Sequence, residues 1–281
     1  MKIHICNIGP PDIFDRKSDI IFGLLHALES LGHNASVGSN IFDPSSINIV
    51  IGSDLICGGD NVMNFLKKAS IEYVVYEVEN FNGQTINYRK DFPLGNYKQF
   101  LENAKFILTP YKYNLPKLSE VVGGEKVHYC KWGFHEKMIN TQFCRNQNTE
   151  FEALFFGLVK GTRLRKLQKL QSVFGKSIKV INEKIPFSSR EYFISRSNLG
   201  LSLSYGATDD FVNPFRIYHM VANGLPVLSD HEIDHDNYLD ICFNSNFDTL
   251  LENIKVHPAN FSELRNRCES NKLASNLKPY F

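Results

Sequence analysis

The chain has 281 residues, of which 43% are hydrophobic and 22% are charged. This composition is that of an ordinary globular protein, and the length suits two compact α/β domains. The 31 Lys and Arg residues nearly balance the 30 Asp and Glu residues, so the charge excludes a surface that binds polyanions over its whole extent, though not a local basic patch. No window reaches the roughly 18 apolar residues of a spanning helix, and the start lacks the pattern of a signal peptide.

The six Cys residues are widely spaced, and none of them forms a Cys-x-x-Cys pair. Paired cysteines are typical of secreted proteins and of zinc sites. We therefore expect reduced, mostly buried thiols in a cytoplasmic protein, without a structural zinc ion.

The first half of the sequence alternates short apolar runs with amphipathic stretches. A run over 2–8 that ends at a Gly-Pro break predicts a strand, and apolar residues spaced by three and four between 20 and 31 predict a helix. The other expected strands are 35–37, 47–51, 73–76, 106–108 and 126–129, and the other expected helices are 61–68, 97–103 and 113–121. This alternation indicates a parallel sheet with helices on both faces.

A polar, Asn- and Gln-rich stretch over 140–149 separates this half from a second alternation. We place the domain boundary there, with an acceptor-side domain over 1–145 and a donor-binding domain over 146–281, whose last helix is a candidate to pack back on the first domain. The strands expected in the second half are 153–156, 178–181, 199–203 and 225–228, and the expected helices are 163–173, 189–195, 214–222, 247–254 and 261–273. The sequence thus predicts two Rossmann-like α/β domains that face a cleft.

Ligands of open α/β sheets bind beyond the carboxyl ends of the strands, so the loops that follow strands carry the chemistry. The loop after 153–156 contains Gly157 and Lys160 and leads to Arg163 at a helix start. Free N–H groups and two fixed positive charges at that place favour binding of a diphosphate. The alternative is a solubilising turn before a surface helix, because one Gly-containing loop is a weak signal.

A second loop follows the strand over 199–203 and leads into the helix over 214–222. Pro214 suits the first helical position, Asn213 suits the N-cap, and Arg216 falls in the first turn, close to an anion bound there. Asp209 and Asp210 precede the helix, where a sugar hydroxyl can be held. The alternative is that Arg216 pairs with a surface carboxylate and that Asp209 and Asp210 are solvated loop residues.

Three segments of the second half carry a resemblance to a known family. They are the run 154–157 followed by Arg163, the helix start Asn213–Ile217, and the Ala-Asn-Gly-Leu-Pro-Val stretch within Met220–Asp230. Over about residues 151–235 the chain resembles the donor domain of GT-B glycosyltransferases, particularly the group-1 and CgeB-like proteins. The resemblance implies transfer of a sugar from a nucleotide donor, without a metal held by an Asp-x-Asp motif.

The chain departs from this family at one position. Many group-1 members carry two Glu residues at a fixed spacing, but here Asp210 and Tyr218 occupy that spacing and the second carboxylate is missing. The contact to the ribose and the stereochemical outcome therefore stay open. Because Phe211 follows the Asp209-Asp210 pair, we expect neither a metal site nor a cofactor beyond the nucleotide-sugar co-substrate.

The first half is expected to supply the acceptor side and a general base, which must be a carboxylate or a His within reach of the acceptor hydroxyl. Glu77 and Glu79 follow the strand 73–76, and Asp12 and Asp15 lie in the first loop. The expected catalytic residues are Glu77, Glu79 and Asp210. The expected donor-binding residues are Gly157, Lys160, Arg163, Tyr205, Asp209, Asn213, Arg216 and Tyr218.

The leading interpretation is a glycosyltransferase with a saccharide or lipid-linked acceptor. The basic helix over 163–173 leaves open a DNA acceptor, as in phage enzymes that glycosylate hydroxymethylated cytosine, although a solvated helix face explains the same charges. A nucleotide-sugar epimerase and a non-catalytic nucleotide-sugar binding protein are the remaining alternatives. A dehydrogenase is disfavoured because no Gly-x-Gly-x-x-Gly follows the first strand.

Overall fold

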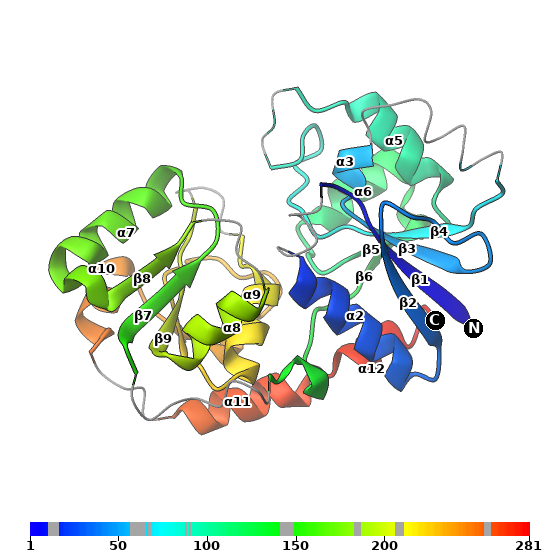
Figure 1. Cartoon of the computed structure of the whole chain (residues 1–281). Helices are drawn as coiled ribbons and strands as arrows, with labels where there is room; N and C mark the ends of the chain where they lie inside the picture. Colours follow the sequence, from blue (N-terminus) through cyan, green and yellow to red (C-terminus); the bar gives the residue numbers. More distant parts are fainter. Residues whose placement is uncertain are drawn as a thin grey trace. The chain divides into compact units, whose positions relative to one another are not determined.

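The computed structural model describes residues 1–10, 17–56, 66, 69–87, 89, 91–140, 149–182, 187–205, 211–255 and 260–281. These residues form two compact units. The first unit comprises Met1–Trp132 and Leu273–Phe281, and the second comprises Gly133–Lys272 (Figure 1). Each unit is built around its own sheet.

The first unit is a parallel sheet with the strand order β2-β1-β3-β4-β5-β6. Its strands are β1 (Lys2–Asn7), β2 (Asn34–Ser39), β3 (Ile47–Ile51), β4 (Tyr73–Tyr76), β5 (Ile107–Thr109) and β6 (Val127–Tyr129). Its helices are α2 (Ser18–Ser30), α3 (Ser53–Ile56), α5 (Leu94–Asn103), α6 (Asn114–Val122), the short 3-10 turn η1 (Gly124–Lys126) and α12 (Leu273–Leu277). Because each strand is followed by a crossover, all carboxyl ends lie at one edge of the sheet.

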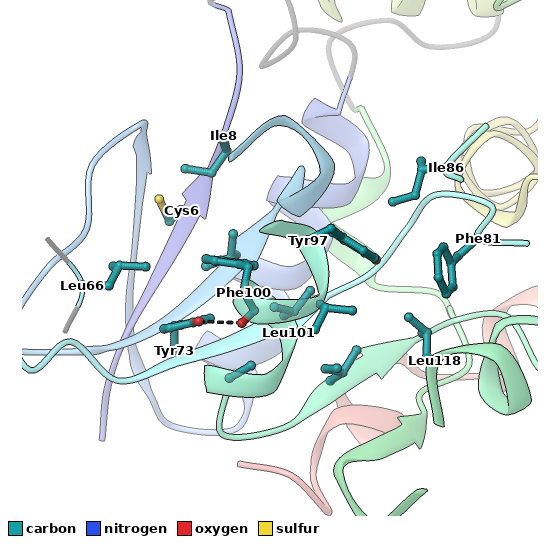
Figure 2. Packing of buried hydrophobic residues seen from close by; sticks show 14 of the residues in the cluster. Cys6, Ile8, Leu66, Tyr73, Phe81, Ile86, Tyr97, Phe100, Leu101 and Leu118 are labelled. Carbon is teal, nitrogen blue, oxygen red and sulfur yellow. Dashed lines mark hydrogen bonds between the residues drawn. The ribbon is translucent and has the colours of Figure 1, made fainter. Parts of the chain in front are cut away.

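One face of this sheet is covered by α5 and α6. Val75 and Ile107 of neighbouring strands are fully buried there together with Phe100 and Leu118 of the two helices. Figure 2 shows these helical side chains turned into the cluster, with the Tyr73 hydroxyl donating to the Phe100 carbonyl oxygen at 2.6 Å. Helices α2 and α12 pack against each other in the same unit.

The last residues of the chain are part of the first unit. Leu273 and Leu277 of α12 are fully buried. The Asn276 amide donates to the carbonyl oxygen of Lys131 at 2.9 Å. The Tyr280 hydroxyl donates to the carbonyl oxygen of Tyr129 at 2.9 Å. These contacts tie the end of the chain to the β6 edge of the sheet.

The second unit is a parallel sheet with the strand order β11-β10-β9-β7-β8. Its strands are β7 (Phe151–Phe156), β8 (Ile178–Ile181), β9 (Ser197–Ser202), β10 (Val227–Ser229) and β11 (Phe243–Asn244). Its helices are α7 (Gly161–Phe174), α8 (Phe187–Ser195), α9 (Pro214–Ala222), α10 (Phe247–Asn253) and α11 (Phe261–Ser270), with the 3-10 turns η2 (Glu136–Met138), η3 (Gly175–Ser177) and η4 (Leu239–Ile241).

Helices cover both faces of this second sheet. On one face α7 and α10 bury Leu167, Leu170 and Leu250 against the strands. On the other face α9 packs so closely that a Cβ atom at Gly200 of β9 would lie 2.4 Å from the Met220 sulfur. Glycine at position 200 therefore sets the distance between α9 and the sheet.

The α/β architecture expected from the sequence is confirmed. The expected boundary near 145 falls within 141–148, outside the described residues, as does the expected helix over 61–68 except for residue 66. The helix expected over 261–273 is divided into α11 and α12. Within the described part of the chain, no helix is both long and apolar enough to cross a membrane.

Candidate functional site

The carboxyl edge of the second sheet gathers most of the residues that the sequence singles out. The loop after β7 leads through Gly157 and Lys160 to α7, and the segment after β9 contains Tyr205. Asp230 follows β10 directly. Parallel strands bring these loops to one edge, together with the N-termini of α7 and α9, where free N–H groups and the helix dipoles favour an anion.

Gly157 and Arg216 form the centre of this edge. Gly157 has a φ of 136°, and a Cβ atom added there would lie 2.3 Å from the Arg216 Nη2 atom. The Arg216 side chain is buried, with its guanidinium carbon 5.2 Å from the ring centroid of Phe155 and 5.5 Å from that of Phe156. Glycine is thus required at 157 both by the backbone and by the space that the guanidinium occupies.

The start of α9 has the cap predicted from the sequence. The Asn213 side chain accepts a hydrogen bond from the backbone N–H of Arg216 at 3.0 Å, and Pro214 occupies the first helical turn. This cap fixes the first turn of α9 and therefore the backbone from which Arg216 extends.

Arg163 holds the strand-end loops together. Its Nε atom donates to the carbonyl oxygen of Leu203 at 2.9 Å, and Nη1 donates to the carbonyl oxygen of Leu158 at 3.0 Å. Its guanidinium carbon lies 5.3 Å from the ring centroid of Tyr205. Burial lowers the pKa of Arg163 to about 10, although the negative charge of Asp230 raises it. The side chain therefore stays cationic at neutral pH.

Asp230 and Lys166 were not among the residues expected at the site. The Asp230 carboxylate lies 2.5 Å from Lys166 Nζ and accepts a hydrogen bond from the backbone N–H of Ser204 at 2.7 Å. Lys166 also donates to the Ser204 hydroxyl. The available signals were an Asp placed directly after a strand and a Lys one helical turn beyond Arg163, and neither identifies its partner.

The local electrostatic field at this edge is positive. Burial lowers the pKa of the neighbouring His231 to about 3, with further contributions from Lys166 and the two arginines described above. A neutral imidazole at ordinary pH follows, since protonation there would add another buried positive charge. Such an edge favours a ligand that carries negative charge.

The other residues expected for donor binding differ in their exposure. Lys160 is exposed directly before α7, and Tyr205 is 36% exposed. Tyr218 is buried on α9, where its hydroxyl accepts a hydrogen bond from the Asn271 amide at 2.6 Å and burial raises its pKa. Asp209 and Asp210 lie outside the described residues.

Glu77 lies at the carboxyl end of β4 in the first unit and is almost completely buried. Its Oε2 atom accepts hydrogen bonds from the hydroxyls of Ser53 (2.7 Å) and Tyr97 (2.6 Å), and Oε1 accepts one from the backbone N–H of Glu79 (2.9 Å). Burial and the charge of Asp54 raise the pKa of Glu77 to about 7. Glu77 therefore connects α3, α5 and the loop after β4.

Glu79 lies two residues further along the chain and is partly exposed. Its carboxylate lies 2.9 Å from Lys17 Nζ and accepts a hydrogen bond from the Asn87 amide at 2.7 Å. Although burial opposes the shift, Lys17 and Asn87 hold the pKa of Glu79 below its ordinary value. Glu79 is therefore ionised at neutral pH. The other carboxylates considered in this half, Asp12 and Asp15, lie outside the described residues.

No protein-family model matches the chain, and no curated protein matches its sequence. Solved structures match over nearly its whole length. HepE of Anabaena in complex with UDP matches with a TM-score of 0.58 at 10% identity, over 99% of this chain and 98% of HepE. An α-glucosyltransferase in complex with UDP and a mismatched DNA matches with a TM-score of 0.57 at 11% identity, over 99% and 95%.

The DNA-modifying enzyme β-glucosyltransferase, studied with and without uridine diphosphoglucose, matches with a TM-score of 0.52 at 14% identity, over 99% of this chain and 94% of that enzyme. At such low identity, likeness of this kind establishes the fold and leaves the activity to the site. The chain has the two-sheet α/β fold of the GT-B glycosyltransferases, which its sequence resembles.

Proposed function

We propose that the protein is a glycosyltransferase that moves a sugar from a nucleotide-sugar donor to a hydroxyl group of an acceptor. The observation that carries this proposal is the placement of Arg216 in the first turn of α9, against Gly157 at the carboxyl edge of the second sheet. The fold likeness to enzymes solved with UDP or uridine diphosphoglucose supports a nucleotide diphosphate as the anion.

The donor reaction breaks the bond between the anomeric carbon of the sugar and the diphosphate oxygen, which leaves with the bonding electrons. Negative charge therefore grows on the diphosphate in the transition state. Arg216 and the N-terminus of α9 would stabilise that charge from fixed positions, and the exposed Lys160 would add a further positive charge. Because these groups supply positive charge of their own, we propose transfer without a divalent metal ion.

The acceptor hydroxyl must lose its proton as its oxygen bonds to the anomeric carbon. Glu79 is the carboxylate proposed to take that proton, because it is ionised and partly exposed. Glu77 has a pKa nearer to neutrality, but its burial and its hydrogen bonds to Ser53 and Tyr97 keep it from an acceptor. Glu77 would instead hold the backbone of Glu79 in place.

A thermal-shift panel with UDP-, GDP-, ADP- and CMP-sugars tests the proposal. A ligand at a hundred times its dissociation constant adds about 2.7 kcal/mol to the free energy of unfolding. We expect a shift with one nucleotide class, which Arg216→Ala abolishes and which Arg267→Ala, an exposed arginine of α11 paired with Glu263, leaves unchanged. No shift with any donor would contradict the proposal. Turnover of the donor alone to an epimer would identify an epimerase instead.

A DNA acceptor is a second candidate, favoured by the fold likeness to the α-glucosyltransferase solved with DNA. Binding of DNA releases counterions, so the affinity falls steeply as salt is raised. If hydroxymethylated DNA is the acceptor, its binding weakens by orders of magnitude between low and moderate salt, whereas an uncharged saccharide acceptor shows little change. Because the 31 basic and 30 acidic residues nearly balance, binding of DNA would require a local basic patch.

A further inference from the structure

Lys166 and Asp230 form an ion pair that is largely removed from solvent. The Asp230 side chain is 1% exposed and the Lys166 side chain 17% exposed, with 2.5 Å between Oδ2 and Nζ. A buried ion pair adds little net stability compared with apolar residues of similar size. A contribution to stability is therefore a weak explanation for the presence of this ion pair. The contacts of its two side chains indicate a second role.

Both members of the pair hold Ser204, which follows β9 in the second sheet. Asp230 Oδ1 accepts a hydrogen bond from the Ser204 backbone N–H at 2.7 Å, and Lys166 donates to the Ser204 hydroxyl. The segment after β9 is thereby attached to α7 through Lys166 and to the end of β10 through Asp230. One residue carries both attachments, so its backbone direction is fixed.

Tyr205 is the next residue, and the Arg163 guanidinium lies over its ring. The guanidinium carbon lies 5.3 Å from the ring centroid, and the guanidinium itself is held by the carbonyl oxygens of Leu203 and Leu158. Tyr205 is nevertheless 36% exposed. An aromatic ring that a guanidinium holds on one side and that is still partly open to solvent suits stacking of a planar ligand group.

We propose that Asp230 is a positioning residue that acts through Lys166 and Ser204 to hold Tyr205 as the surface on which the base of the nucleotide stacks. This inference rests on the proposed function. Among the parts of a nucleotide-sugar, the base is the planar aromatic group, whereas the sugar and the diphosphate offer no ring face of this kind. Stacking on an aromatic side chain is worth about a tenfold or larger change in affinity.

The test compares the dissociation constants of UDP and inorganic diphosphate in titration calorimetry. We expect Asp230→Ala to weaken UDP by about tenfold and inorganic diphosphate by less than about threefold. Asp230→Asn keeps an acceptor for the Ser204 N–H and should fall between Asp230→Ala and the wild type. Lys166→Met should act in the same direction and less than additively with Asp230→Ala. The control is Lys169→Met, which removes an exposed ion pair with Asp248 on the same helix.

A purely structural role would lower the melting temperature and weaken both ligands by the same factor, and that result would overturn the inference. Unchanged UDP binding in Asp230→Ala would do the same. If Asp230→Ala does not fold, Tyr205→Leu and Tyr205→Phe carry the test, since only the first removes the ring. If the wild-type protein binds no nucleotide at all, the proposed function and this inference fail together.

Discussion

Replacement of Gly157 by alanine tests the geometry at the centre of the proposed donor site. The new Cβ atom would lie 2.3 Å from Nη2 and 3.0 Å from Cζ of Arg216, on a backbone with a φ of 136°. The backbone strain costs about 1–3 kcal/mol, and displacement of the guanidinium from its two aromatic neighbours costs up to about 2 kcal/mol more. We expect a loss of about 2–4 kcal/mol, which lowers the melting temperature of the second unit by roughly 5–15 °C.

The same substitution should weaken UDP binding, because the guanidinium must leave its position. A double-mutant cycle with Arg216→Ala separates the two causes. Without the guanidinium, Gly157→Ala should cost only its backbone strain, which gives a coupling energy of about 1–2 kcal/mol in thermal unfolding. Strictly additive effects, or a Gly157→Ala variant with wild-type melting temperature and UDP affinity, would refute the placement of Arg216.

Further predictions concern the first unit. Because the pKa of Glu77 is raised to about 7, the folded state keeps its proton where the unfolded chain has lost it, so the stability advantage of wild type over Glu77→Gln should shrink between about pH 4.5 and 7 in denaturant titrations. Leu277→Ala empties a fully buried position of α12 and should cost about 2–5 kcal/mol in calorimetric unfolding, with unchanged UDP affinity below the transition. Glu79→Gln should lower kcat by about a hundredfold or more, with little change in donor KM, and wild-type kcat would contradict its role.

The alternation of apolar runs and amphipathic stretches was sufficient to predict the fold. The runs 47–51 and 73–76 are rich in β-branched and aromatic residues, and both are strands at those bounds. The strand β11 (Phe243–Asn244) was not predicted, because two residues carry no periodicity. The helix expected over 261–273 is divided after Ser270, where the carbonyl oxygen of Asn271 accepts a hydrogen bond from the backbone N–H of Phe134, a residue far away in sequence.

The sequence predicts the role of a site residue only where that role depends on residues close to it along the chain. Asn213 caps α9 as expected, since a cap depends on neighbours three residues away. The roles of Arg163 and Asp230 depend on carbonyl and amide groups 40 and 26 residues away, which no local pattern reveals. Similarly, nothing around Tyr218 in the sequence indicates that its hydroxyl pairs with Asn271.

The sequence also does not distinguish the two candidates for the general base that follow β4, Glu77 and Glu79. Glu77 and Glu79 are two residues apart just beyond β4, and a regular strand would turn both side chains to the same face. The strand ends at Tyr76, and Glu77 is buried whereas Glu79 is partly exposed. The sequence does not show which of them meets Ser53 and Tyr97 in the interior. Burial therefore distinguishes two carboxylates that the sequence treats alike.

The most direct test of the central claim is release of nucleoside diphosphate from nucleotide-sugars by the purified protein, followed by a coupled assay with and without a panel of hydroxyl acceptors. We predict release from one nucleotide-sugar that an acceptor accelerates, that Arg216→Ala abolishes, and that proceeds with a chelator present. Absence of both binding and release with every donor at millimolar concentration would contradict the assignment of a nucleotide-sugar site to the carboxyl edge of the second sheet.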